Sequence, residues 1–407
     1  MSHRAYPGTA ARTRYHDGAV QILAGLRRDA EALAEVACRA VTALSSSHRV
    51  YANVTMGHMP KDELVNEREG NPGLFEFVAA DACSPEQYAA MVPGDVLLTN
   101  HVGPGERAAR EAGVFVAVAT TCYAENGNAP AGVMGPNENG WLPEDVASQV
   151  IDSHVPWEQG LVRLPEVPEM VVLPSSAIGA CAVHWAITAE VAGGLAAGAA
   201  PDGALARQYL DTLLQRLEEI HRGDSRAIAR IGAAVAARLA GGGHLYVRSR
   251  NGGVRAEASR LAQGLVLTNA HQPRPAAEGG DGDVMVVAAV SPNDPEELAW
   301  AEAARACGNL VIGIGQPHNG ELRDRCDAYL DDRCPEDAGV VPIPGRAEAV
   351  CPATGIVNNV ILHLLTAEFV EQMCRRGAVP SFLMGGYRLA GQEYNEASEA
   401  RFRRLGY

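Results

Sequence analysis

The chain is 407 residues long, 47% of them hydrophobic and only 5% aromatic, and its formal net charge is -15. This length suits two domains, whose interiors must be built mainly from small aliphatic side chains, as in helices packed tightly on a sheet. The basic residues are scattered and form no run, which excludes the basic stripe that a nucleic-acid partner would need.

Cysteine usage and the N-terminus indicate the compartment. The nine cysteines are spread out without a CxxC pair, which is typical of reduced thiols in a cytoplasm. Residues 1–17 contain no apolar run that resembles a signal peptide, and no uninterrupted apolar stretch reaches membrane-spanning length. We therefore expect a cytoplasmic protein with no membrane partner. Without an HExxH motif or paired Cys/His spacing, we expect no metal and no other cofactor.

In the first half, helices alternate with short apolar runs. Periodicity predicts a helix over 18–45 and a short helix over 106–112, and buried strands are expected at 49–54, 95–99 and 113–118. Strands that alternate with helices imply right-handed crossovers and a parallel sheet. A Gly-, Asn- and Pro-rich loop over 125–143 either covers a site or is simply mobile.

The same order recurs in the second half, with a helix over 204–239, a helix over 296–307, and strands at 243–247, 283–287 and 309–313. A small-residue segment over 193–204 is the expected joint. The chain after 376 looks aperiodic, and we expect it to pack on a neighbouring domain or subunit. The predicted division is a first domain over 1–197, a linker over 198–203, a second domain over 204–376 and a tail over 377–407.

Short sequence motifs of the first half recur in the second half at a nearly constant spacing. The segment DSHVP at 152–156 corresponds to DDRCP at 331–335, 179 positions later. In the same way, TAE at 188–190 corresponds to TAE at 366–368, 178 positions later. Two unrelated α/β units could share common strand words, but the constant offset favours an internal duplication.

The turn after the first predicted strand lies where a parallel sheet exposes its ligand crevice, outside the carboxyl ends of the strands. Gly57 there would let the backbone approach a ligand closely, and His58 could act as an acid or base. Glu63, at the start of the next helix, could move a proton between adjacent sugar carbons. The alternative is an ordinary polar loop followed by a solvated, acidic helix start.

The matching turn of the second half pairs glycines with arginines. Gly252 and Gly253 precede a predicted helix, with Asn251 and Arg250 beside them. Backbone amides at a helix N-terminus and nearby guanidinium groups favour an anion site, although the Gly pair alone is a weak signal.

The turns after the second strands are further candidates for phosphate binding. They hold Thr99, Asn100 and His101 in the first half and Ser291 in the second. Their hydroxyls and amides could cradle a phosphate, but prolines in both turns remove donors.

A helix is expected late in each half. One begins after Ser175 and Ser176 and the other after Thr354, residues suited to helix starts. His184 and His363 lie one turn or more inside these two helices. Either could face the site and open a sugar ring, or be a helix histidine with its hydrogen bonds satisfied.

Several of these sequence motifs resemble those of a known protein family. NGGVRAEASRLA at 251–262 is similar to the NGGS-initiated turn and helix of sugar isomerase (SIS) domains such as phosphoheptose isomerase, and 150–156 and 175–182 resemble a group of SIS-domain phosphosugar-binding proteins. The resemblance implies an α/β fold of two tandem SIS-like three-layer α/β/α domains, each with a parallel, roughly five-stranded sheet. It also implies a homo-oligomer with sites between subunits.

The resemblance implies a small-molecule partner, a sugar or sugar phosphate, that is isomerised through an enediol, cleaved or deaminated, or only sensed. The catalytic Glu of the family maps to Glu63 and its ring-opening His to His184 or His363. Both halves lack the SxSGxT phosphate loop of the family. The leading hypothesis is an isomerase-type enzyme; the alternatives are a non-catalytic sugar-binding or regulatory module, or a sugar-phosphate lyase or deaminase.

Overall fold

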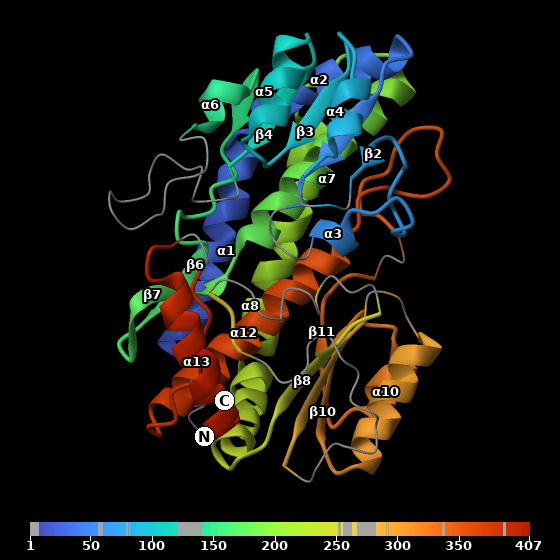
Figure 1. Ribbon diagram of the computed structural model, residues 1–407. Helices are drawn as coiled ribbons and strands as arrows, with labels where there is room; N and C mark the ends of the chain where they lie inside the picture. The colour runs from blue at the N-terminus through green and yellow to red at the C-terminus, as the bar shows by residue number, and fades with distance from the viewer. Residues whose placement is uncertain are drawn as a thin grey trace.

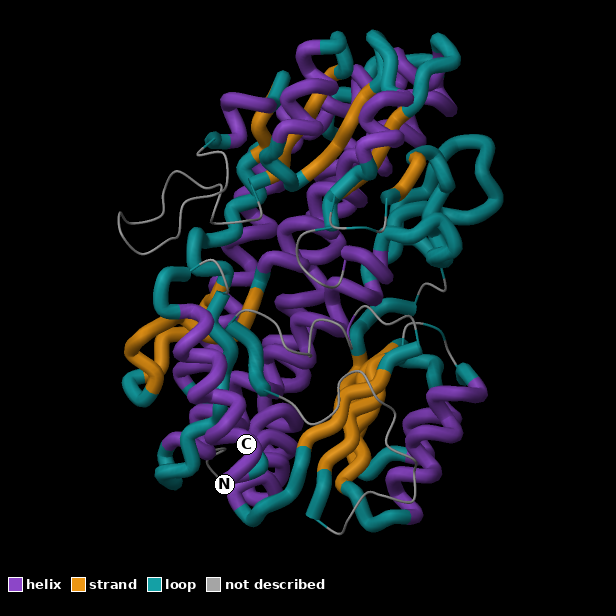
Figure 2. Tube along the Cα trace, in the orientation of Figure 1, coloured by secondary structure: helices purple, strands orange, loops and turns teal. Residues whose placement is uncertain are grey.

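The computed structural model describes residues 8–55, 60–78, 80, 82–120, 141–250, 254, 263–266, 282–289, 291, 293–335, 338–385 and 388–407. Two α/β halves meet along a central layer of long helices, and a parallel sheet lies toward each end of the molecule (Figure 1). Figure 2 shows the same division, with long helices between the two sets of strands.

The first half contains a five-stranded parallel sheet with the order β2-β1-β3-β4-β5. Its strands are β1 (Val50–Asn53), β2 (Glu76–Phe77), β3 (Val96–Thr99), β4 (Phe115–Ala119) and β5 (Gln149–Ile151). The short helices between them are α3 (Pro60–Glu63), α4 (Pro85–Ala90), α5 (Pro104–Glu111) and α6 (Pro143–Val146). An antiparallel pair then leads into a long helix: β6 (Gly160–Leu164), β7 (Val167–Pro174) and α7 (Ser176–Ala197).

The second half begins with the longest helix, α8 (Ala204–Ala240), and has a parallel sheet with the order β11-β10-β9-β8. Its strands are β8 (Leu245–Arg248), β9 (Val284–Ala288), β10 (Leu310–Gly315) and β11 (Ala328–Asp331). The helices that follow are α10 (Pro295–Ala306), α11 (Gly320–Arg325) and α12 (Thr354–Cys374). All strand pairs of this sheet are parallel, as predicted.

Each sheet is covered on both faces, which makes each half a three-layer unit. On β3, Val96 and Leu98 join the core shared with the central helices, whereas Leu97 joins an outer cluster under α4 and α5. On β9, Val286 faces the central helices and Val287 faces α10. Because both faces are buried, the strands are apolar runs without alternation, and this is why the sequence shows them clearly.

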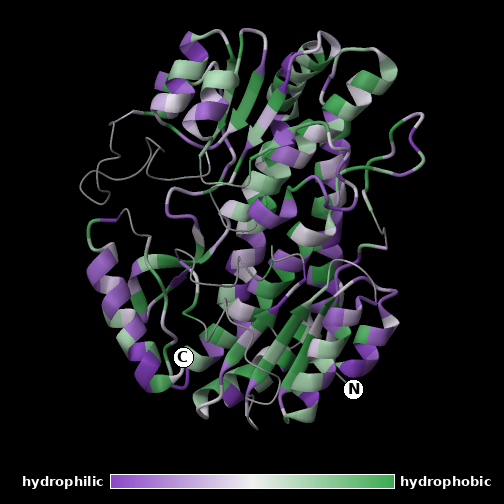
Figure 3. Ribbon diagram, turned by 45° about the vertical axis from the view of Figure 1, so that its right-hand side comes forward, coloured by the Kyte–Doolittle hydropathy of each residue, from purple (hydrophilic) through white to green (hydrophobic). Residues whose placement is uncertain are grey.

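The central helices join the halves into one core. The first two are α1 (Ala10–Arg28) and α2 (Ala30–Ser45). α1 packs on α8 and α12 as well as on α7, so one hydrophobic cluster runs through both halves. Figure 3 shows the apolar residues of these helices and of the sheets gathered in the interior. Among the described helices α7 is long and apolar enough to span a membrane, but 94% of its apolar window is buried, as expected of a core helix.

Corresponding positions of the halves make matched contacts. The Tyr15 hydroxyl on α1 donates to the Pro174 carbonyl just before α7, and the Tyr209 hydroxyl on α8 donates to the Pro352 carbonyl just before α12, both at 2.9 Å. Glu190 on α7 accepts the Ala206 amide of α8, whereas Glu368 on α12 accepts the Thr9 amide before α1. Each late helix therefore fixes the start of the other half's first helix.

The repeated sequence motifs also adopt the same backbone conformation. His154 and Arg333 both have left-handed φ angles of 58°, and the backbone amide of each is bound by an Asp two residues earlier at 2.8 Å. Leu173 and Cys351 form a second left-handed pair, with φ of 66° and 64°. Non-glycine residues seldom adopt this conformation, so its recurrence at the spacings of the repeated words means that the two halves share backbone detail.

Two sequence expectations are corrected. The helix expected over 18–45 begins at Ala10 and breaks at Asp29, whose carboxylate meets the His154 ring at 2.7 Å. The tail is not aperiodic: it contains α13 (Gly391–Leu405). It packs on the second half, where Phe382 bridges to Leu265, and it also reaches the first half, where Arg388 donates to the Glu169 carbonyl at 3.1 Å. The predicted domain boundaries stay a prediction, although α7 and α8 end and begin where the joint was expected.

Candidate functional site

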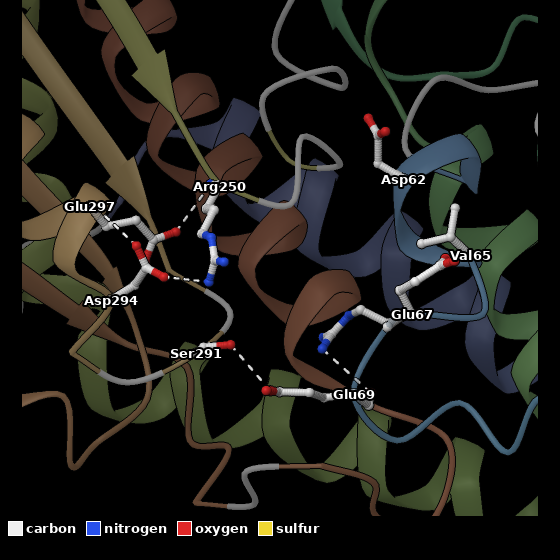
Figure 4. A pocket seen from close by; sticks show the side chains of 9 residues that line it. Asp62, Val65, Glu67, Glu69, Arg250, Ser291, Asp294 and Glu297 are labelled. Atoms are coloured by element: carbon white, nitrogen blue, oxygen red, sulfur yellow. Dashed lines mark hydrogen bonds and ion pairs between the residues drawn. The ribbon is translucent and has the colours of Figure 1, made fainter.

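A cavity of about 370 Å³ lies between the two halves (Figure 4). Its second-half wall is at the end of β8, after β9 and at the start of α10, which is the carboxyl edge of the second sheet. Its first-half wall is the segment that includes the end of α3 and the loop after it. The lining residues are Asp62, Val65, Glu67, Arg68, Glu69, Arg250, Ser291, Asp294 and Glu297.

The start of α10 supplies the acidic part of the second-half wall. Asp294 is the N-cap of this helix, and its carboxylate accepts the Glu296 and Glu297 amides at 2.9 and 3.2 Å. Its other oxygen pairs with Arg250 at 2.5 Å. Because Pro295 has no amide proton, the free donors that open a helix are already used here.

Glu297 is the buried carboxyl group of the cavity. It is 1% exposed, and its Oε1 accepts the Arg250 amide at 3.1 Å. Its Oε2 has no hydrogen-bond partner among the described residues. Burial, followed by the repulsion of Asp294, raises its pKa to about 8, so the side chain is largely protonated at neutral pH.

The first-half wall is held by an ion pair within the first half, whose arginine also bonds to the second half. Arg68 Nε lies 3.3 Å from Glu63 Oε2, and Arg68 Nη2 donates to the Thr354 hydroxyl at 3.3 Å, at the first residue of α12. The Glu63 carboxylate lies over Gly355, where a Cβ would come within 2.3 Å of it. Farther along, the Cys351 amide donates to the Gly70 carbonyl at 2.8 Å. This wall is therefore anchored on the second half.

The two walls also touch directly across the cavity. The Ser291 hydroxyl donates to Glu69 Oε2 at 3.1 Å, and Figure 4 shows these side chains pointing toward each other from opposite sides. Five of the nine lining residues are acidic and two are basic, so the lining is acidic overall. The chemistry available is hydrogen bonding to hydroxyls and amines, together with proton exchange at a buried carboxyl.

Glu63 is close to the cavity but does not line it. Its side chain is 0% exposed and paired with Arg68, so it is placed to position that arginine, and a role for Glu63 as the base stays a prediction. Gly57 and His58 lie outside the described residues, as do Asn251, Gly252 and Gly253. Arg250 and Ser291 are the predicted binding residues that the fold brings together in the cavity.

The remaining first-half candidates have structural contacts. The Thr99 hydroxyl accepts the His101 amide at 3.0 Å, and Asn100 accepts the Thr55 amide at 3.2 Å at the edge of the first sheet. The Ser175 hydroxyl donates to the Gln159 carbonyl at 2.8 Å, and Ser176 is the buried first residue of α7. None of these residues lines the cavity between the halves.

The two helix histidines are core residues. The His184 ring packs edge-on against Phe75 and Trp185, and burial lowers its pKa to about 3, so it is neutral. The His363 ring lies 5.2 Å from that of Tyr15, and its side chain is buried. Neither histidine is among the lining residues, and both are buried. Because His184 Nδ1 has no hydrogen-bond partner among the described residues, the alternative of a helix histidine with satisfied hydrogen bonds stays a prediction.

Sequence reasoning missed Arg68 and Glu297, although a signal for the latter existed. Pro104 and Pro295 each open the helix after a second strand, and each is followed two residues later by a buried glutamate, Glu106 and Glu297. This shared Pro-x-Glu motif directly follows the two turns that were candidates for phosphate binding. Arg68 had no comparable signal, because its role depends on contacts with the other half.

Comparison with known proteins finds relatives that are named as UPF0309 proteins. A UPF0309 protein of Streptomyces griseus is 28% identical over 235 residues, which are 48% of this chain and 93% of that protein. A UPF0309 protein of Listeria innocua is 24% identical over 227 residues, 46% of this chain and 92% of that protein. No family model matches the chain.

Among solved structures, the chain is similar to a Clostridium difficile protein described as a candidate phosphosugar isomerase, with a TM-score of 0.49, 9% identity and coverage of 91% and 95% of the two chains. It is also similar to the C-terminal domain of glucosamine-fructose-6-phosphate aminotransferase from Francisella tularensis, with a TM-score of 0.48, 12% identity and coverage of 92% and 98%.

Proposed function

We propose that the chain binds a sugar or sugar derivative in the cavity between its halves and moves a proton on it with a carboxyl group. The observation that carries this proposal is the position of the cavity. It lies outside the carboxyl ends of β8 and β9, the edge where open parallel sheets bind ligands. Carboxylate, guanidinium and hydroxyl groups converge there from both halves, and such groups pair with sugar hydroxyls.

The carboxyl group best suited to the chemistry is Glu297. An isomerisation needs a base that takes a proton from the carbon next to the carbonyl of the open-chain sugar. The electron pair left on that carbon forms the enediol double bond as the former carbonyl oxygen takes up a proton. The neighbouring hydroxyl then loses its proton and the abstracted proton returns to the former carbonyl carbon, so the oxygen protons balance and no oxidant is required. A group with a pKa of about 8 is ionised in roughly one molecule in ten at pH 7 and can both accept and return a proton.

Glu63 contributes by position. Its ion pair fixes the Arg68 guanidinium at the cavity wall, while Thr354 fixes the second edge of the same group. Arg68 is buried, so its orientation is set before a ligand arrives. A pre-organised guanidinium loses little conformational entropy on binding sugar hydroxyls.

A non-catalytic sugar-binding module is the second candidate. It is favoured by the burial of His184 and His363 in the core, which leaves no imidazole among the described lining residues to open a sugar ring. A lyase or deaminase would use the same proton transfer and differ in the bond that breaks afterwards. Oligomeric assembly and a cytoplasmic location stay predictions.

Solvent deuterium exchange separates these functions. Sugars that raise the melting temperature are incubated with the protein in deuterated water and followed by NMR. We expect deuterium at the carbon next to the carbonyl with the wild type, and loss of exchange with retained binding in Glu297→Gln. Glu144→Gln, the same change on α6 away from the cavity, is the control. Binding without exchange in the wild type favours the module, and full exchange in Glu297→Gln excludes Glu297 as the base.

A further inference from the structure

We propose that the cavity selects a sugar that carries a protonated amine and discriminates against the corresponding sugar phosphate. This inference rests on the proposed function and specifies the substrate class of the same site.

The start of α10 is closed to phosphate. A helix N-terminus usually attracts an anion through its free amides, but here the Asp294 carboxylate already binds the amides of Glu296 and Glu297. Pro295 supplies no donor. A phosphate placed here would meet a carboxylate in the position where the anion itself should lie. The corresponding helix of the first half, α5, also begins with a proline and has a buried glutamate in its first turn, Pro104 and Glu106.

The two arginines of the lining are already engaged with carboxylates. Arg250 pairs with Asp294, and Arg68 pairs with Glu63 and donates to Thr354. A phosphate would have to compete with these partners for both guanidinium groups. The positive charge of the lining is therefore largely neutralised before a ligand binds.

The remaining lining groups suit an ammonium ion. Glu67 and Glu69 add two more carboxylates, and a protonated amine presents three donors to such oxygens. The buried Glu297 Oε2 has no hydrogen-bond partner among the described residues, and once the carboxyl group is ionised this oxygen is one that an ammonium group would satisfy. In that form the unpartnered oxygen points to a donor ligand in a way that surface acidity alone does not.

Binding of an ammonium group should release a proton. A neighbouring positive charge favours the ionised form of a carboxyl group, so the bound amine drives Glu297 to give up its proton near neutral pH. A neutral sugar would not do this. Proton release is therefore a signature of the amine beside Glu297, independent of affinity.

The test compares three matched panels by thermal shift and calorimetry: glucosamine, galactosamine and mannosamine, the corresponding hexoses, and the corresponding hexose 6-phosphates. We expect the hexosamines to bind at least tenfold more tightly than the phosphates, with proton release at pH 7 seen as a dependence of the heat on the buffer. Proton release should vanish in Glu297→Gln. In Glu67→Gln/Glu69→Gln the preference for amine over phosphate should fall at least threefold, with Glu144→Gln as the control.

The other outcomes separate the two proposals. Tighter binding of the phosphates overturns the amine inference and keeps sugar binding. Equal binding of hexoses and hexosamines without proton release also overturns the amine inference and keeps sugar binding. Failure of all three panels to bind counts against the amine inference and against the proposed function together.

Discussion

The Glu63 carboxylate of the first half lies directly over Gly355, the second residue of α12 in the other half. A Cβ at position 355 would be 2.3 Å from the carboxyl carbon and from both oxygens. Only a residue without a side chain allows this contact. The glutamate in turn holds Arg68 at the wall of the cavity, so a glycine in one half sets the position of a guanidinium from the other.

Gly355→Ala should therefore destabilise the protein and disturb the cavity. The methyl group must displace a buried ion pair, and overpacking of this kind costs about 1–3 kcal/mol. Urea unfolding measures the change. Gly320→Ala is the matched control, because a Cβ there meets nothing within 4 Å. Equal stability of the two variants would show that Glu63 does not occupy the place described.

The Glu63–Arg68 pair should behave as a buried pair. Removal of one partner leaves an unpaired charge, so Glu63→Gln should cost about 3–5 kcal/mol, and Glu63→Gln/Arg68→Met should recover part of the loss. The exposed pair of Arg107 and Glu111 gives the comparison, and Glu111→Gln should cost less than about 1 kcal/mol. The prediction fails if the double variant is as unstable as the sum of its single changes.

Glu297 should make stability depend on pH. Its pKa is raised by folding from 4.5 to about 8, so the folded state binds the proton more tightly than the unfolded state. Its stabilising contribution is complete below pH 4.5 and is lost as pH rises through 8. Glu297→Gln should therefore become more stable relative to the wild type between pH 5 and pH 8.5, by on the order of 2–4 kcal/mol. Parallel pH profiles of the two proteins in urea unfolding would contradict this.

The matched tyrosines should contribute equally. Tyr15→Phe and Tyr209→Phe each remove one hydroxyl that donates to a buried carbonyl at 2.9 Å, and each should cost about 1–2 kcal/mol. Unfolding of each variant and of the pair measures this. A large difference between the two would mean that the halves do not use the same contact in the same way.

The sequence predicted the sheets well because their strands are buried on both faces. β1, β3 and β4 appear as short apolar runs, as do β8, β9 and β10. β2, β5 and β11 were missed because they are short: Glu76 and Phe77 alone form β2, and three and four residues form β5 and β11. α13 was missed because it buries only Gly391 and Ser398, so it has no apolar stripe. Its position depends on the rest of the second half.

The sequence predicted only the part of the site that lies at the carboxyl ends of the strands. Arg250 and Ser291 follow β8 and β9, and the carboxyl ends of parallel strands meet at one edge, so their proximity follows from the chain order. Arg68 and Glu69 reach the same cavity only because the first half docks on the second, which no local pattern encodes. The burial that raises the pKa of Glu297 depends on the same packing.

Hydrogen–deuterium exchange of the backbone, with and without a sugar that raises the melting temperature, tests the shared cavity most directly. We predict that the ligand slows exchange in residues 62–69 of the first half and 293–298 of the second half together, while α6 is unchanged. Protection confined to the edge of the first sheet around Thr99–Glu106, or to one half alone, would contradict a binding site built from both halves.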